Sequence, residues 1–151
     1  MADKFQKPLQ SALTISPSPA PERRIMPAAR ILVIEDGSAV RRALKRLFES
    51  EGYSVDLAAD GISGLELLRK TAPSALLLDL TLPDISGQEI YRKIIQVAPM
   101  LPIIVISAKT DVAEKAALLK MGACDYVTKP FSPRELLASV RAALRDRRRS
   151  A

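Results

Sequence analysis

Short apolar runs alternate with longer amphipathic stretches from residue 30 to the end of the chain. A continuous apolar run of four or five residues is typical of a strand buried on both faces of a parallel sheet. Residues 53–58 instead alternate apolar and polar side chains, which predicts a half-exposed strand at the edge of the sheet. The pattern predicts five strands, over residues 31–35, 53–58, 75–79, 103–107 and 125–128.

The stretches after these strands have the spacing of amphipathic helices. Ser38 can cap the first helix, Ser86 and Asp111 begin capping-box patterns, and Ser132 precedes a proline at a first helical position. The predicted helices cover residues 38–51, 61–71, 86–97 and 111–121, and a last one begins at 132. The first carries one apolar face at helical spacing, made of Val40, Ala43, Leu44, Leu47 and Phe48.

Strand and helix alternate five times, which predicts an α/β domain of (βα)5 type. Right-handed crossovers favour a doubly wound, parallel five-stranded sheet with helices on both faces. We expect the folded domain over residues 30–145. Residues 1–29 hold five of the 11 prolines without a sustained apolar period, which predicts a flexible Pro-rich extension. Residues 146–151 are predicted to be a basic tail or linker.

The net charge of +6 lies outside residues 30–140, because these residues hold 14 basic and 14 acidic side chains. We therefore expect no direct nucleic-acid binding by this chain. The absence of histidine and the single cysteine nearly exclude a structural zinc site. No apolar stretch suits a signal peptide or a membrane span, so a cytoplasmic location without membrane contact is expected.

Polar residues stand where four of the predicted strands end. In parallel sheets the ligand site lies at the carboxyl ends of the strands, so these side chains should meet at one edge. Three carboxylates, a hydroxyl and an ammonium at one edge indicate chemistry more than packing. The residues are Glu35, Asp36, Asp79, Ser107 and Lys129.

Together these groups suit phosphoryl transfer. The carboxylate of Asp79 could attack phosphorus, and the nearby acids Glu35 and Asp36 suit a hard cation such as Mg²⁺. Lys129 and Ser107 could contact the phosphoryl oxygens. Each residue alone also has a plainer interpretation, as a turn or cap aspartate, solvated loop acids, a surface lysine and a strand-end hydroxyl.

The chain resembles the receiver domains of bacterial two-component response regulators over roughly residues 30–145. The resemblance depends on four segments that occur in the family's order and at its separations. They are ILVIED at 31–36, LLLDLTLPDISG at 76–87, VISAK at 105–109 and GACDYVTKPF at 122–131.

The resemblance implies the flavodoxin-like strand order 2-1-3-4-5. It makes Asp79 the phosphoacceptor, with Lys129 and Ser107 binding the phosphoryl group. It also implies that Mg²⁺ binds to Glu35, Asp36, Asp79 and the backbone carbonyl of Thr81. Ser107 and Tyr126 would form the switch, with Tyr126 turning inward on phosphorylation, and the Lys129-Pro130 bond would be cis. Gly37 departs from the family, which often has a third polar residue there.

The expected function is a phosphorylation-activated switch of a two-component system or phosphorelay. A histidine kinase or histidine phosphotransfer protein would supply the phosphoryl group. The surface from 111 to 145 would then change and bind a downstream protein or a second copy. Such a domain is not an enzyme, since it catalyses only its own phosphorylation and dephosphorylation.

Two alternatives stay open at this point. The chain could be the receiver fragment of a larger DNA-binding transcriptional regulator. It could also be a phosphohydrolase with an aspartyl nucleophile, although Thr81 stands where that class commonly has a second acid. A flavin carrier of the same fold fits poorly, because Glu35 and Asp36 would repel its phosphate.

Overall fold

A computed structural model describes residues 29–108 and 112–150, and side chains up to Asp146. Residues 1–28 of the predicted extension and the predicted cap Asp111 therefore lie outside the described residues. All ten predicted strands and helices are present in the described part of the chain. In chain order they are β1 (Arg30–Ile34), α3 (Ser38–Ser50), β2 (Ser54–Ala58), α4 (Gly61–Thr71), β3 (Ala75–Asp79), α5 (Gly87–Val97), β4 (Ile103–Ser107), α6 (Val112–Lys120), β5 (Asp125–Thr128) and α7 (Pro133–Ser150).

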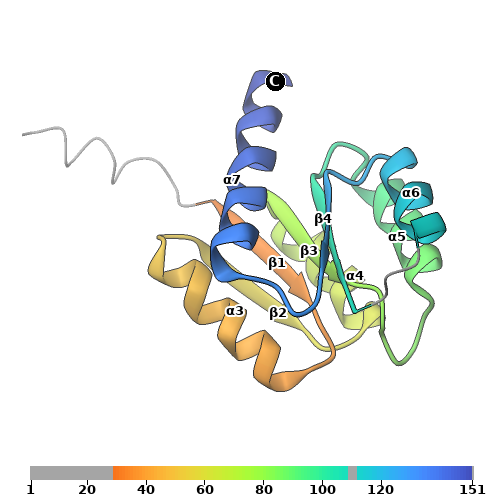
Figure 1. Cartoon of the computed structure of the whole chain (residues 1–151), viewed down its shortest axis with the longest axis horizontal. Coiled ribbons are helices and arrows are strands. Elements are labelled where there is room, and N and C mark those ends of the chain that lie inside the picture. Colours follow the sequence, from red (N-terminus) through yellow and green to blue (C-terminus); the bar gives the residue numbers. More distant parts are fainter. Residues whose placement is uncertain (1–28, 109–111, 151) are drawn as a thin grey trace, which may run out of the picture.

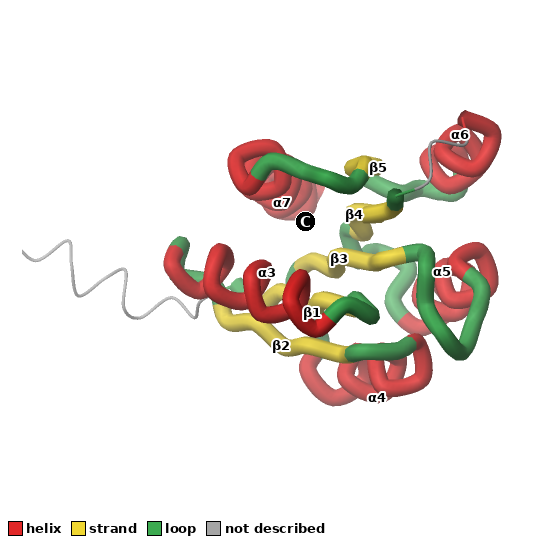
Figure 2. The backbone as a smooth tube through the Cα atoms, turned by 60° about the horizontal axis from the view of Figure 1, so that its bottom comes forward, coloured by secondary structure: helices red, strands yellow, loops and turns green. Residues whose placement is uncertain are grey.

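The five strands form one sheet in the order β2-β1-β3-β4-β5, and every neighbouring pair is parallel. This confirms the (βα)5 fold and the strand order. Figures 1 and 2 show α3 and α7 on one face of the sheet and α4, α5 and α6 on the other. The carboxyl ends of all five strands therefore open at the same edge.

Each face of the sheet has its own hydrophobic core. On one face, Leu44 and Phe48 of α3 and Val140 of α7 pack on side chains of the central strands. On the other, Leu68 of α4 and Ile94 of α5 belong to the second core. Strands β1, β3 and β4 are almost wholly buried, which explains why their sequences are continuous apolar runs.

Helix α4 packs unusually closely on β1 at Gly64. A Cβ built on this glycine would lie 2.4 Å from Cδ1 of Ile34, well inside van der Waals contact. The absence of a side chain at residue 64 thus sets how near α4 approaches the sheet.

Two details predicted for the first helix are wrong. Ser38 is the first helical residue, and the cap is Gly37, which supplies no side-chain cap bond. The backbone N–H of Gly37 instead donates to Oε2 of Glu35 at 2.8 Å, which fixes the chain one residue earlier. Ala43 is exposed, because the Leu44 and Phe48 pair faces the sheet and Ala43 lies about 100° away around the helix.

Two of the other predicted helix caps are present in the structure. Ser86 accepts the backbone N–H of Glu89, and Ser132 accepts that of Glu135, both at 3.2 Å, so these two predicted caps are confirmed. Helix α7 continues to Ser150, through the segment for which a tail or linker is predicted.

Candidate functional site

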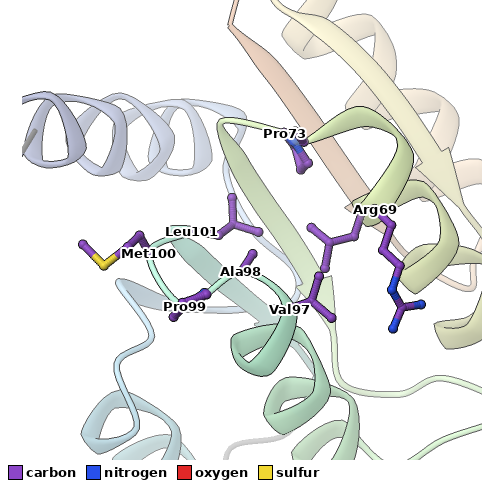
Figure 3. A pocket seen from close by; sticks show the side chains of 9 residues that line it. Arg69, Pro73, Val97, Ala98, Pro99, Met100 and Leu101 are labelled. Carbon is purple, nitrogen blue, oxygen red and sulfur yellow. The ribbon is translucent and has the colours of Figure 1, made fainter.

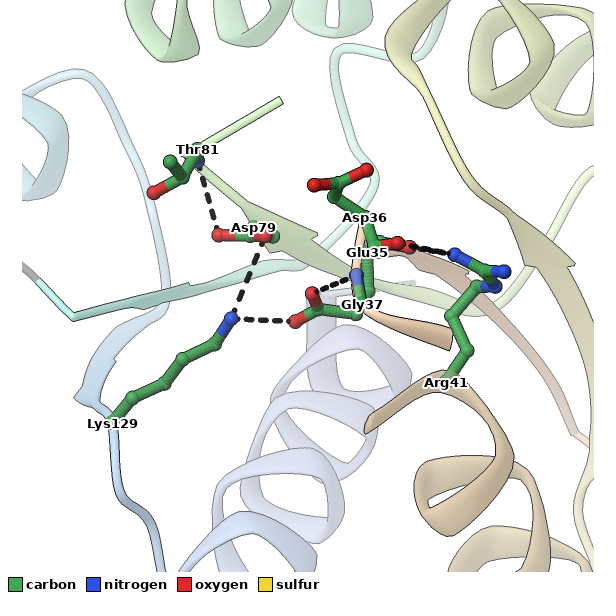
Figure 4. A network of polar contacts seen from close by, with 7 residues as sticks. All are labelled: Glu35, Asp36, Gly37, Arg41, Asp79, Thr81 and Lys129. Atoms are coloured by element: carbon green, nitrogen blue, oxygen red, sulfur yellow. Dashed lines mark hydrogen bonds and ion pairs between the residues drawn. The ribbon is translucent and has the colours of Figure 1, made fainter. Parts of the chain in front are cut away.

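Three of the predicted site residues lie together at the carboxyl edge of the sheet (Figure 4). Asp79 is the last residue of β3, Glu35 follows β1, and Lys129 follows β5. The Nζ of Lys129 lies 2.8 Å from Oε1 of Glu35 and 3.5 Å from Oδ2 of Asp79. Parallel strands that end at the same edge of the sheet therefore bring together side chains that are separated by up to 94 residues along the chain.

Asp79 is buried, with 2% of its surface exposed. Burial raises the pKa of its carboxyl group, and the nearby charge of Glu35 adds to this effect. The backbone N–H of Thr81, which donates to Oδ1 at 3.0 Å, and the ammonium of Lys129 oppose the shift without cancelling it. The surroundings of Asp79 therefore favour the protonated carboxyl group over the carboxylate.

Lys129 supplies the positive charge at the centre of the cluster. Burial alone would lower the pKa of its ammonium, but the contacts with Glu35 and Asp79 outweigh burial and raise that pKa. The lysine is therefore held in its charged form. Its backbone N–H donates to the carbonyl of Ser107 at 2.8 Å, and the Lys129-Pro130 bond is cis. The backbone hydrogen bond to Ser107 fixes where the Lys129 side chain leaves the main chain.

Glu35 divides its two oxygens between Gly37 and Lys129. Oε2 accepts the N–H of Gly37, whereas Oε1 is fully buried and has no hydrogen-bond partner of good geometry among the described residues. The Nζ of Lys129, 2.8 Å from Oε1, forms an ion pair with it. Lys129 is therefore the cation that this buried oxygen faces.

Asp36 is exposed, and its carboxylate points into the open edge of the site in Figure 4. Its main-chain carbonyl, like that of Glu35, accepts a hydrogen bond from Nη1 of Arg41. Arg41 was not predicted from the sequence. The available signal was its position in the sequence: Arg41 comes five residues after Asp36 and about one turn into the helix that follows the acidic pair.

The oxygen ligands present here suit Mg²⁺. They are carboxylates and a backbone carbonyl, which a hard cation prefers. Among the described residues no three acidic or cysteine side chains are gathered as a ready-made metal cage. Mg²⁺ commonly takes only one or two carboxylates and keeps several waters. The carboxylates of Glu35 and Asp79 share the ammonium of Lys129, so their negative charge exceeds the positive charge between them, and a cation would fit beside them.

Ser107 is the last residue of β4, and Tyr126 lies on β5. Ser107 is completely buried. Tyr126 is also buried, with 7% of its surface exposed, and its hydroxyl donates to Oε1 of Glu114 on α6 at 3.3 Å. The Nζ of Lys115 lies 5.9 Å from the centre of the Tyr126 ring. The aromatic ring predicted to turn inward on phosphorylation is thus already inside the protein.

The loop after Asp79 is tied to the neighbouring helix α4. Oδ1 and Oδ2 of Asp84 accept the backbone N–H groups of Gly61 and Ile62 at 2.9 and 3.0 Å. These bonds lower the pKa of the Asp84 carboxyl group. The loop that carries Thr81 is therefore anchored on both sides, at Asp79 and at the start of α4.

A cavity of about 440 Å³ lies far from this chemistry. It is bordered by Pro73, which precedes β3, and by Leu101, which precedes β4 (Figure 3). These residues stand at the amino ends of the strands, whereas Asp79 stands at a carboxyl end. The cavity is therefore separate from the acidic cluster.

Comparison with known proteins agrees with this geometry. The family model of the response regulator receiver domain matches residues 31–141. The response regulator MprA of Mycobacterium leprae (strain TN) is 45% identical over 116 residues, which are 77% of this chain and 51% of that protein. MprA of Mycobacterium bovis (strain BCG / Pasteur 1173P2) is 44% identical over 118 residues, 78% of this chain and 51% of the relative. This chain thus spans about half the length of these curated relatives.

Solved structures show the same relationship. A CheY-like receiver domain protein from Methanospirillum hungatei JF-1 has a TM-score of 0.79 and 29% identity, covering 83% of this chain and 100% of that one. A LuxR-family two-component response regulator from Aurantimonas sp. SI85-9A1 has a TM-score of 0.73 and 34% identity, covering 80% and 87% of the two chains.

This family comprises signalling domains and not enzymes that turn over a substrate, and it generally uses Mg²⁺ and a histidine kinase partner. No helix in the described part of the chain is both long enough and apolar enough to cross a membrane. The fold, the acidic cluster at the carboxyl edge and the match over residues 31–141 agree. The chain belongs to the response regulator receiver domains of two-component signalling.

Proposed function

We propose that this receiver domain is a phosphorylation-activated switch whose phosphoacceptor is Asp79. The observation that supports it most directly is the buried Asp79 carboxylate, 3.5 Å from the Nζ of Lys129 and at the open carboxyl edge of the sheet. The donor is a sensor histidine kinase or a histidine phosphotransfer protein. A bond forms between a carboxylate oxygen of Asp79 and phosphorus, while the phosphorus–nitrogen bond of the phosphohistidine breaks and the imidazole keeps the electron pair.

The residues around Asp79 divide the supporting roles. Glu35, Asp36, Asp79 and the carbonyl of Thr81 would hold Mg²⁺, which neutralises charge on the transferred oxygens when bound. Such a cation would also favour the ionised, nucleophilic form of Asp79, whose pKa burial raises. Lys129 and Ser107 bind the phosphoryl oxygens once the group is on Asp79.

Phosphorylation changes the partners of Lys129. Its ammonium is shared between Glu35 and Asp79 in this structure. A phosphoryl group adds about 1.5–2 negative charges and new acceptor oxygens. Lys129 and Ser107 then move toward these oxygens, and the strands β4 and β5 carry the change to the surface over residues 111–145. That surface binds a downstream protein or a second copy of the chain.

The Tyr126 ring is already buried before phosphorylation. Phosphorylation would therefore strengthen an inward position that the ring occupies beforehand. Such a change is a shift of population between two packings, and its size depends only on the preference of the phosphoryl group for one of them.

One alternative keeps the same phosphorylation site. The coverage of about half of each MprA relative favours a receiver that works within a longer, DNA-binding regulator, to which α7 would lead. Sequencing the transcript that encodes this chain, followed by a gel-shift assay of its product with and without phosphorylation, distinguishes this form. Phosphorylation-dependent DNA binding would support it, and a transcript that encodes no further domain would contradict it.

The acceptor is tested by intact-mass measurement after incubation with Mg²⁺ and acetyl phosphate. The chain should gain one phosphoryl group, roughly 80 Da, and Asp79→Asn should gain none. Asp60→Asn is the matched control, because asparagine is as good a helix cap as the aspartate that caps α4. The same mass gain in Asp79→Asn would contradict the assignment.

A further inference from the structure

Arg41 reaches back from α3 to the loop that carries the two acids. Its Nη1 donates to the main-chain carbonyl of Glu35 at 2.8 Å and to that of Asp36 at 2.7 Å. Its own backbone N–H closes the first turn of the helix on the carbonyl of Gly37 at 2.9 Å. One residue therefore ties three consecutive carbonyls of the loop to the body of the helix.

These contacts orient the loop without using its carboxylates. In Figure 4 the guanidinium group lies on the far side of the loop from Asp79, and the carboxylate of Glu35 points toward Lys129. Two neighbouring carbonyls held by one nitrogen fix the peptide plane between Glu35 and Asp36. Both acidic side chains therefore leave the main chain in set directions.

We infer that Arg41 is a positioning residue for the acidic half of this site. By holding the main chain of Glu35 and Asp36, it keeps their carboxylates where a divalent cation can share them with Asp79. This inference rests on the proposed function, because it concerns the same cation. It adds a residue that touches neither the cation nor the phosphoryl group.

The positioning role of Arg41 and its charge predict opposite changes in Mg²⁺ affinity when the arginine is replaced. A positive charge near the acids repels a divalent cation, so its removal through charge alone would tighten Mg²⁺ binding. Loss of the hydrogen bonds releases the loop, and the loss of a residue that orients metal ligands typically weakens metal binding about tenfold or more. The sign of the change in affinity therefore separates the two effects.

The neighbouring Arg42 provides a matched control. It lies on the same helix, is exposed, and changes the net charge by the same amount when replaced by glutamine. Mg²⁺ should be titrated into the native chain, Arg41→Gln and Arg42→Gln, with the backbone amide of Gly37 as an NMR probe. That amide donates to Oε2 of Glu35 and so reports on the acidic loop directly.

We expect Arg41→Gln to bind Mg²⁺ about tenfold more weakly. Arg42→Gln should bind as the native chain does, or slightly more tightly. Unchanged or tighter binding by Arg41→Gln would overturn the inference, as would an equal weakening in both variants. Melting curves show whether each variant is folded. If Arg41→Gln does not fold, Arg41→Lys replaces it, with weaker binding again expected and native affinity again overturning the inference.

The same titration separates this inference from the proposed function. A native chain that binds no Mg²⁺ would contradict the proposed metal ligands themselves. A native chain that binds Mg²⁺ as tightly as Arg41→Gln does would leave those ligands in place and remove only the role of Arg41.

Discussion

Lys129 lies closer to Glu35 than to Asp79, with Nζ at 2.8 Å from Oε1 of the glutamate and 3.5 Å from Oδ2 of the aspartate. In the unphosphorylated domain Lys129 therefore pairs mainly with Glu35, the buried acid next to the proposed acceptor. A phosphoryl group on Asp79 would compete with Glu35 for this ammonium. The geometry couples the stability of the unphosphorylated domain to the same side chain that would bind the phosphoryl group.

Replacement of Lys129 should accordingly cost stability as well as phosphoryl binding. In Lys129→Gln the carboxylate of Glu35, only 3% exposed, loses its cation, and this costs about 2 kcal/mol in the free energy of unfolding. Urea denaturation measures the loss, and Lys93→Gln on the exposed side of α5 is the control. Added Mg²⁺ should restore part of the stability. Equal stability of the two variants would show that Lys129 is not the partner of Glu35.

The raised pKa of Asp79 predicts how stability depends on pH. Because the folded state holds this proton more tightly than the unfolded state does, folding loses stability as the pH rises from the usual value of 3.8 through the raised pKa. Asp79→Asn removes this cost and should melt at a higher temperature than the native chain at pH 7. Its advantage should shrink as the pH falls toward 4. An equal or lower melting temperature at pH 7 would contradict a net unfavourable environment for the carboxylate.

The placement of the acidic cluster could be predicted from the sequence. Asp79 and Lys129 each stand at the end of a predicted strand. Parallel strands bring their carboxyl ends to one edge of the sheet for any conformation of the connecting loops. The contacts of Arg41 and of Asp84 could not be predicted. They depend on how two irregular loops fold back onto helices, and no periodicity in the sequence encodes that. Ser38 shows the same limit, since the cap of the first helix is Gly37 and not the predicted Ser38.

Gly64 should be a sensitive position in the core. Because a Cβ there would lie 2.4 and 2.8 Å from side-chain atoms of Ile34, Gly64→Ala should push α4 away from β1 and cost about 1–3 kcal/mol. Ser63→Ala, on the exposed side of the same helix, should change stability little and serves as the control. Urea unfolding of both variants measures the difference. A stabilised Gly64→Ala would mean that helix propensity outweighs this close contact.

Asp84 should hold the start of α4. In Asp84→Ala the N–H groups of Gly61 and Ile62 lose their acceptors, so their amide hydrogens should exchange faster. Acid should weaken the same contacts. Because the pKa of the Asp84 carboxyl group is lowered in the folded chain, the stability that its carboxylate contributes is present above the usual pKa and is lost as the pH falls through the lowered one. Hydrogen exchange followed by NMR measures both effects. The amides of α7, which is far along the chain and on the other face of the sheet, serve as internal controls.

The hydroxyl of Tyr126 predicts how the signal leaves the site. Its bond to Glu114 tethers a buried ring to α6. In Glu114→Ala this hydrogen bond to α6 is lost, so the ring should spend more time outside. Beryllofluoride, as a mimic of the phosphoryl group, should then draw the ring back in.

Amide shifts on adding beryllofluoride test this coupling. The described residues of α6 and β5 should shift more in Glu114→Ala than in the native chain, because the native ring is already inside. Glu114→Gln keeps an acceptor oxygen and should behave as the native chain does, and Glu49→Ala on the exposed side of α3 is the control for charge. If the shifts in Glu114→Ala equal those of the native chain, the tether has no part in the switch. If α6, β5 and α7 show no shifts in any variant, the signal leaves through another surface, and the proposed role of residues 111–145 is wrong.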